Sequence, residues 1–161
     1  MLSMQDNQVI KTQAHNTMSS HKPLHKSKLL VAHFSSLPSR EALYGEIMAW
    51  GKKLSPFDPA WKTEENRVAG CQSVMYLYSH LEGPQVIFYA ASDALISAGL
   101  AALLIEVYSG EPAETILLSP PQFLEDLGIP SVLTPGRANG LASLYLKMKQ
   151  EALRHLVPLR S

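Results

Sequence analysis

Cysteine is almost absent from this sequence, in which Cys71 is the single thiol among 161 residues. One thiol cannot form an internal disulfide, and by itself it cannot ligate a structural zinc ion or an iron–sulfur cluster. A free thiol persists best in a reducing compartment, and we therefore expect a cytoplasmic protein.

An excess of charge of either sign is also missing. The chain has 14 basic and 14 acidic residues and no run of five or six like charges. Because phosphate backbones are bound by a basic excess or a clustered basic face, we expect no nucleic-acid partner. The histidines are scattered, and the one pair four residues apart, His21 and His25, lies in a polar segment, so we expect no metal site.

Long apolar runs are absent too. Residues 1–28 lack the apolar segment of a secretory signal peptide. The most apolar stretch, residues 94–110, reaches Glu106 too early to span a bilayer, so we expect no membrane partner. Residues 1–23 combine low apolar content with no periodicity, which predicts a disordered tail. Residues 24–157 remain as one domain, long enough to bury a core.

Two helices are predicted at the start of this domain. Residues 24–36 are expected to form the first, which ends before Pro38. Ser39 then supplies an N-cap for the second. Its apolar residues recur at helical spacing and are Leu43, Ile47, Trp50 and Leu54. Pro56 ends this helix, and residues 55–70 are expected to form a polar loop.

A β-hairpin is predicted in the middle of the chain. Residues 74–78 and 85–91 are rich in aromatic and β-branched side chains, and Gly83–Pro84 lies between them as a turn. His80 is expected within the turn region.

The rest of the chain is predicted to be helical. Residues 92–110 are apolar nearly all round, which indicates a central buried helix with Ser92 or Asp93 as its N-cap. Further helices are predicted at residues 111–118, 119–128 and 134–156. The last of them carries one apolar stripe, made up of Leu141, Leu144, Tyr145, Met148 and Ala152. This order predicts an α+β fold, a single domain in which a small antiparallel hairpin or sheet packs against several helices.

Cys71 lies at the junction between the polar loop and the first predicted strand. A lone cysteine is more often a small buried hydrophobic residue than a nucleophile. A reactive role is favoured by Gly70, which lets a ligand or another backbone approach, and by the polar pair Gln72 and Ser73, which offers donors to a thiolate. No basic residue flanks Cys71 directly, and both interpretations remain open at this point.

Three segments in fixed order resemble a known family. "ENRVAGCQS" is followed by "SDALISAGLAALL" and then by "LTPGRANGL". Together they resemble the SufE family of sulfur-acceptor proteins, which includes CsdE, over about residues 27–153. The family pattern usually has a tryptophan shortly after GCQS, where this chain has Tyr76 and Tyr78.

The resemblance implies a sulfur carrier. Proteins of this family take persulfide sulfur from a pyridoxal-phosphate-dependent cysteine desulfurase, of the SufS or CsdA kind, and stimulate that enzyme. They pass the sulfur to the iron–sulfur scaffold machinery. On this chain the acceptor is Cys71, in a protein that is not itself an enzyme and binds no cofactor. The loop at residues 55–70 is expected to swing the thiol towards partners.

The resemblance also implies supporting roles for Asp93 and Arg137. Gln72 is expected to support Cys71 because it is its neighbour in sequence. Asp93 has a structural alternative as a helix N-cap, worth about 1 kcal/mol. Arg137 begins the last helix, where the macrodipole disfavours a cation, which indicates contact with a partner or with a thiolate; the alternative is a solvated surface arginine.

Two other functions remain as alternatives. One is a cysteine-nucleophile hydrolase or transferase with His80 or His155 as its base. The other is a scaffold domain in which Cys71 is inert. Reactivity of the Cys71 thiol discriminates between an inert residue and the other two roles.

Overall fold

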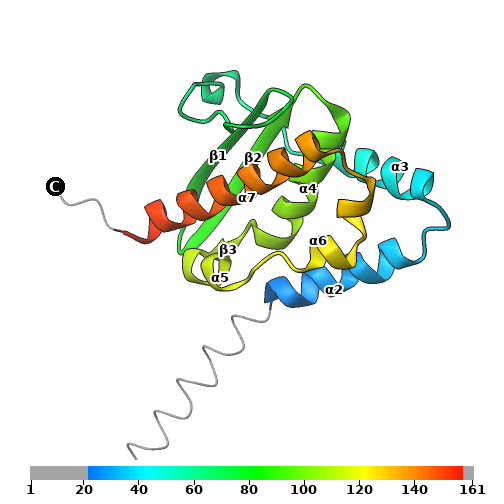
Figure 1. Ribbon diagram of the computed structural model, residues 1–161. Helices are drawn as coiled ribbons and strands as arrows, with labels where there is room; N and C mark the ends of the chain where they lie inside the picture. Colours follow the sequence, from blue (N-terminus) through cyan, green and yellow to red (C-terminus); the bar gives the residue numbers. More distant parts are fainter. Residues whose placement is uncertain (1–21, 158–161) are drawn as a thin grey trace, which may run out of the picture.

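Helices cover one face of a three-stranded antiparallel sheet in the computed structural model, which describes residues 22–157 (Figure 1). The elements in chain order are α2 (Lys22–Ser35), α3 (Arg40–Gly51), the 3-10 helix η1 (Pro59–Trp61), β1 (Met75–Glu82), β2 (Gln85–Ser92), α4 (Leu95–Tyr108), β3 (Glu111–Pro112), α5 (Ala113–Leu118), α6 (Phe123–Asp126), the 3-10 helix η2 (Ile129–Val132) and α7 (Pro135–Leu156). The predicted α+β class is therefore confirmed. The predicted tail lies outside the described residues, apart from its last two positions, which already belong to α2.

The hairpin forms where the sequence predicts it. Glu82 pairs with Gln85 across a two-residue turn, in which Gly83 adopts a left-handed φ of 60° that favours glycine. The strands extend further than expected, and His80 lies within β1 opposite Ile87 rather than in the turn. The prediction of His80 in the turn region was wrong, because the tight turn leaves residues 79–82 free to pair.

The third strand, β3, was not predicted from the sequence. It has only two residues, which pair with Gln85 and Val86 at the start of β2. A strand this short shows no alternation, so hydrophobic periodicity cannot reveal it.

The two faces of the sheet differ in their covering. The inward residues alternate along both strands and are Met75, Leu77 and Ser79 from β1 and Val86, Phe88 and Ala90 from β2. They face α4 and α7, which contact β2 and β1 respectively (Figure 1). On the opposite face the Trp61 ring of η1 stacks on Tyr78 with the ring centroids 4.1 Å apart. The loop that carries Trp61 thus covers part of the face that the helices leave free.

α4 is the central buried helix that the sequence predicts. Most of its residues are inaccessible, including Leu103 and Leu104. Gly99 allows α3 to cross it closely, since a β-carbon at residue 99 would lie 1.9 Å from the carbonyl oxygen of Ile47. On α7, Leu144 and its neighbours on the predicted apolar stripe complete the core against α4 and the sheet.

The segment before Cys71 is more ordered than a patternless loop. The Val68 N–H donates to the Met75 carbonyl at 2.9 Å, and the Leu77 N–H donates to the Asn66 carbonyl at 2.8 Å. Residues 66–68 therefore run antiparallel to the start of β1, and the Asp93 contacts described below fix the chain again at Val74. The part of the chain free to move the thiol is shorter than the expected 55–70 loop.

Candidate functional site

Cys71 lies in the turn that connects residues 66–68 to β1, and its side chain is partly exposed. The turn begins at Gly70, whose φ of 76° lies in the left-handed region, so glycine is required to direct the chain towards α7. The sulfur lies beside a cavity of about 10 Å³ between the beginnings of α4 and α7. Gln72, Ser97, Arg137 and Gly140 line the cavity, together with apolar side chains of β1, α4 and α7.

A glycine of α7 makes room for the sulfur. A β-carbon at Gly140 would lie 2.9 Å from Cys71 Sγ, closer than any real contact of that kind. Gly140 is also buried, so the thiol packs directly against the helix backbone. Glycine at this position therefore makes room for the cysteine in particular.

Serine hydroxyls link Cys71 to a charged group. Cys71 Sγ lies 3.6 Å from Ser73 Oγ, and the Ser73 hydroxyl donates to Ser97 Oγ at 2.8 Å. Arg137 Nη1 donates to the same Ser97 oxygen, also at 2.8 Å. Ser92 Oγ lies 3.4 Å from Ser73 Oγ at the edge of this group.

Arg137 is half-buried at the beginning of α7, the position predicted for it. Its backbone N–H is capped by the Thr134 hydroxyl, and its guanidinium turns inward to Ser97 rather than outward to water. Within residues 22–157 no carboxylate pairs with it. The positive charge is thus directed towards the cavity beside Cys71.

Gln72 and Asp93 hold the turn in different ways. The Gln72 side chain packs on the first turn of α7, since a β-carbon at Gly136 would lie 2.7 Å from it. Asp93 was predicted as an N-cap of α4, and this is wrong: Ala94 occupies the N-cap position and makes no side-chain capping bond. Instead Asp93 Oδ1 accepts a hydrogen bond from the Val74 N–H at 3.0 Å, and the Asp93 N–H donates to the Val74 carbonyl. Asp93 therefore fixes the chain three residues after Cys71.

The histidines proposed as bases for a cysteine nucleophile lie elsewhere. His80 is five residues along β1 from Met75, which corresponds to about 16 Å of extended strand. His155 lies near the end of α7, where its Nε2 is 2.9 Å from Ser79 Oγ. Neither His80 nor His155 is therefore placed to act as a base for Cys71, which disfavours the hydrolase alternative as the sequence posed it.

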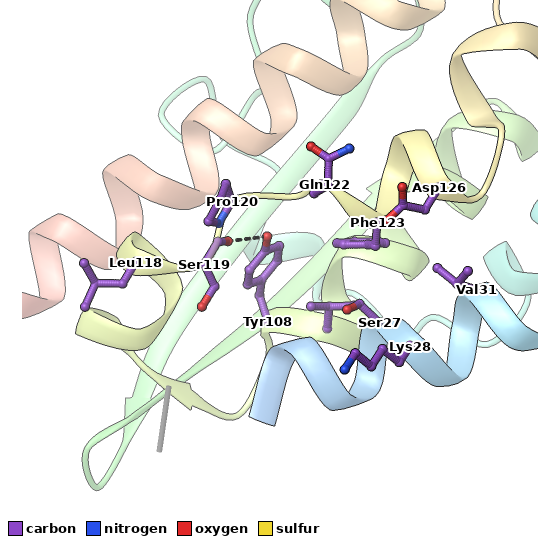
Figure 2. Close-up of a pocket in the computed structure, with 11 residues that line it drawn as sticks. Ser27, Lys28, Val31, Tyr108, Leu118, Ser119, Pro120, Gln122, Phe123 and Asp126 are labelled. Carbon is purple, nitrogen blue, oxygen red and sulfur yellow. Dashed lines mark hydrogen bonds between the residues drawn. The ribbon is translucent and has the colours of Figure 1, made fainter. Parts of the chain in front are cut away.

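A larger cavity, of about 420 Å³, is bounded by α2, the end of α4 and the α5–α6 segment. Figure 2 shows the residues that line it. Tyr108 and Phe123 form part of its wall, and the Tyr108 hydroxyl donates to the Ser119 carbonyl at 2.6 Å. None of the predicted site residues lines it. Tyr108 follows Ser97 by eleven residues, which places this cavity about 16 Å along α4 from the cysteine site.

Ser97 is the site residue that the sequence interpretation missed. It is 3% exposed on α4 and contributes a polar group to an otherwise apolar helix face. A buried hydroxyl on an apolar helix needs a partner, and that requirement is the signal available in the sequence. The partner itself lies forty residues away, so the sequence does not identify it.

The family model and the named relatives that this chain matches indicate the same family. The family model described as "SufE: Fe-S metabolism associated domain" matches residues 28–152. "SufE-like protein 1, chloroplastic/mitochondrial" of Arabidopsis thaliana is 39% identical over 129 residues, which are 80% of this chain and 35% of that protein. "Cysteine desulfuration protein SufE" of Plasmodium falciparum is 32% identical, over 77% of this chain and 52% of its own length. This chain thus spans about a third and about half of these two relatives.

Other relatives are covered almost completely. "Cysteine desulfuration protein SufE" of Wigglesworthia glossinidia brevipalpis is 31% identical over 76% of this chain and 86% of its own length. The solution structure of a hypothetical protein from Thermus thermophilus superposes with a TM-score of 0.69 at 28% identity, over 81% of this chain and 96% of that one. With the family model matched over most of its length, this chain belongs to the SufE family, whose domain is associated with iron–sulfur metabolism.

Proposed function

We propose that this protein accepts persulfide sulfur on Cys71 from a pyridoxal-phosphate-dependent cysteine desulfurase and stimulates that enzyme. The observation that carries the proposal is the setting of the thiol. Cys71 is the single cysteine of the chain, is partly exposed, and lies against a small cavity that the cationic side chain of Arg137 also lines. A nearby second thiol would discharge a persulfide as a disulfide, and this chain has none.

The transfer is a thiol exchange. The Cys71 thiolate attacks the terminal sulfur of the donor persulfide and forms a new sulfur–sulfur bond. The bond between that sulfur and the donor cysteine breaks, and its electron pair leaves on the donor thiolate. No oxidant is consumed, because the transferred sulfur keeps its oxidation state. The Cys71 thiol loses its proton to solvent before the attack, and the desulfurase thiolate that leaves takes up a proton from solvent afterwards, so protons balance over the transfer.

The cavity suits a cysteine that carries one additional atom. Its volume of about 10 Å³ corresponds to about one water-sized sphere. A terminal sulfur directed into it would be sheltered from reductants by the helix backbone at Gly140 and would face the Arg137 side of the cavity. Delivery then requires the turn around Cys71 to open towards the next acceptor.

The protein acts as a carrier and activator rather than as an enzyme in this proposal. The partners are a desulfurase of the SufS or CsdA kind and the iron–sulfur scaffold machinery. Two relatives bear the name "Cysteine desulfuration protein", which supports sulfur transfer as the activity. We keep the cytoplasm as the proposed location, although the name of the plant relative assigns that protein to the chloroplast and mitochondrion. Within residues 22–157, no helix is both long enough and apolar enough to span a membrane.

Intact-protein mass spectrometry tests the proposal. The full chain is incubated with cysteine and a candidate desulfurase, and the expected product is the protein with one added sulfur, removed by reductant. The same incubation without desulfurase, and with Cys71→Ser, should give no adduct. An adduct of equal yield on Cys71→Ser, or none on the parent with desulfurases of both kinds, would contradict the proposal.

A further inference from the structure

Ser97 is the centre of the polar contacts beside Cys71, and it lies within the segment "SDALISAGLAALL", in which the sequence interpretation gave a site role only to Asp93. Its oxygen accepts two hydrogen bonds, one from Ser73 and one from Arg137. A hydroxyl oxygen has two lone pairs, so both are engaged in holding these neighbours. Ser97 is also 3% exposed, which excludes water as the replacement partner in this arrangement.

We propose that Ser97 is a positioning residue that couples the Arg137 guanidinium to the anionic sulfur of Cys71 through the hydroxyl of Ser73. Arg137 contacts Ser97 rather than the cysteine itself, and Ser73 is the hydroxyl 3.6 Å from Cys71 Sγ. The coupling is a property of the unmodified protein; its importance for sulfur transfer rests on the proposed function.

The hydroxyl hydrogens explain how the coupling responds to charge. With a neutral thiol, the Ser73 hydroxyl donates to Ser97, and its lone pairs face the sulfur. When the sulfur becomes an anion, as a thiolate or as a persulfide, rotation of the Ser73 O–H directs its hydrogen to Cys71. Ser97 then keeps its charge-assisted bond from Arg137, and no buried acceptor is left without a donor.

The location of Ser97 makes it more than a packing residue. It lies on α4, the most buried helix, so the atom on which Arg137 and Ser73 converge is fixed by the core. Its two partners lie nearer the surface. Ser73 is in the turn after Cys71, and Arg137 is in the first turn of α7. A rigid acceptor therefore sets the distance between the thiol and a cation that has no carboxylate partner within residues 22–157.

The test measures the rate at which iodoacetamide alkylates Cys71 at neutral pH, followed by intact mass. The thiolate is the reacting form, so loss of the coupling should slow alkylation. We expect Ser97→Ala to lower the rate about three- to tenfold, the range that one ordinary hydrogen bond supplies. Ser97→Thr, which keeps the hydroxyl, should restore most of it. Ser109→Ala, the same change at the other end of α4, is the matched control and should leave the rate within about twofold.

Whether Ser97→Ala is alkylated more slowly or faster distinguishes a positioning role of Ser97 from a purely structural one. If Ser97 only stabilised the fold, its loss would loosen the turn, expose the thiol and raise the alkylation rate. Unchanged or faster alkylation of Ser97→Ala would therefore overturn the proposal.

A double-mutant cycle tests the route through the arginine. Arg137→Met should slow alkylation to a similar degree, and Ser97→Ala added to it should slow it little further, because the two groups act as one unit. If the double variant were slowed by the product of the two single-variant factors, the two residues would act independently, and the coupling would be contradicted. The assay contains no desulfurase, so a correct result here combined with failed sulfur uptake would refute the proposed function and not the positioning role.

Discussion

Gly140 of α7 lies so close to Cys71 that a β-carbon at position 140 would be 2.9 Å from the cysteine sulfur. The contact joins a helix in the core to a turn at the surface. Because a backbone cannot yield as a long side chain can, any added atom at this position must displace the cysteine.

We predict that Gly140→Ala shortens the lifetime of the persulfide rather than unfolding the protein. Alanine favours the helix by about 1 kcal/mol over glycine, which offsets part of the packing strain. The displaced sulfur loses its shelter against α7. The measurement is the rate at which dithiothreitol removes the added sulfur from the loaded protein, by mass spectrometry, and the variant should lose it faster. Equal rates would show that the packing of Cys71 against Gly140 does not protect the persulfide.

The second prediction concerns desulfurase stimulation. Cys71→Ser should fold normally, because serine is nearly isosteric and the site is partly exposed, and it should no longer stimulate a cognate desulfurase. Sulfide release from cysteine in the presence of a reductant, together with thermal unfolding, checks both parts. Stimulation at the parent level by the serine variant would show that the protein activates its partner by contact alone.

The third prediction compares how much two glycines within helices contribute to the stability of the fold. Gly99→Ala should destabilise the protein by about 3 kcal/mol or more, because its β-carbon would meet the Ile47 carbonyl at 1.9 Å and two helix backbones would have to separate. Gly45→Ala in α3 is the control, since nothing lies within 4 Å of its β-carbon and the change should stabilise by about 0.5–1 kcal/mol. Urea unfolding of both variants gives the comparison. A stable Gly99→Ala protein would mean that α3 and α4 do not cross as described.

The fourth prediction is a pH dependence at the far end of α7. Burial alone would raise the pKa of Glu151, but hydrogen bonds from Arg154 and Ser79, with the charges of Arg154 and Lys147, outweigh it and hold the pKa below its ordinary value of 4.5. A lowered pKa in the folded state means that the carboxylate stabilises the fold above pH 4.5, and that this contribution is lost as the pH falls through the folded pKa.

Glu151→Gln should therefore cost about 1 kcal/mol at neutral pH, less than a buried charged hydrogen bond contributes, because Arg154 is more than half exposed. The cost should shrink as the pH falls below 4.5. Denaturant unfolding at several pH values measures it, with Glu106→Gln at an exposed position as the control. A cost that stayed constant across this range would show that packing, and not the carboxylate charge, is responsible.

The elements that the sequence predicts well are those with long periodic signals. The buried α4 and the apolar stripe of α7 each repeat over several turns, and the hairpin has a glycine–proline turn between two apolar runs. The two residues of β3 carry no such signal, and its pairing depends on where the chain returns after α4.

Side-chain partners in the site were harder to predict than the elements. Asp93 precedes a helix, so the local sequence favours it as an N-cap. In the structure, Asp93 instead forms two hydrogen bonds with the backbone of Val74. Ser97 and Arg137 are forty residues apart and meet only because α4 and α7 begin at the same end of the sheet. Such contacts depend on tertiary packing, which adjacency and spacing in the sequence do not encode.

The anchors on either side of Cys71 limit how far its sulfur can travel. The chain is held at Val68 by β1 and at Val74 by Asp93, so Cys71 stands at the middle of an arc with three residue steps to each anchor. Even fully extended, three steps reach about 10 Å. While both anchors hold, the Cys71 sulfur can move no further than this arc allows. If the proposed function is correct, a donor whose cysteine lies deeper than that must move this cysteine outward to meet Cys71.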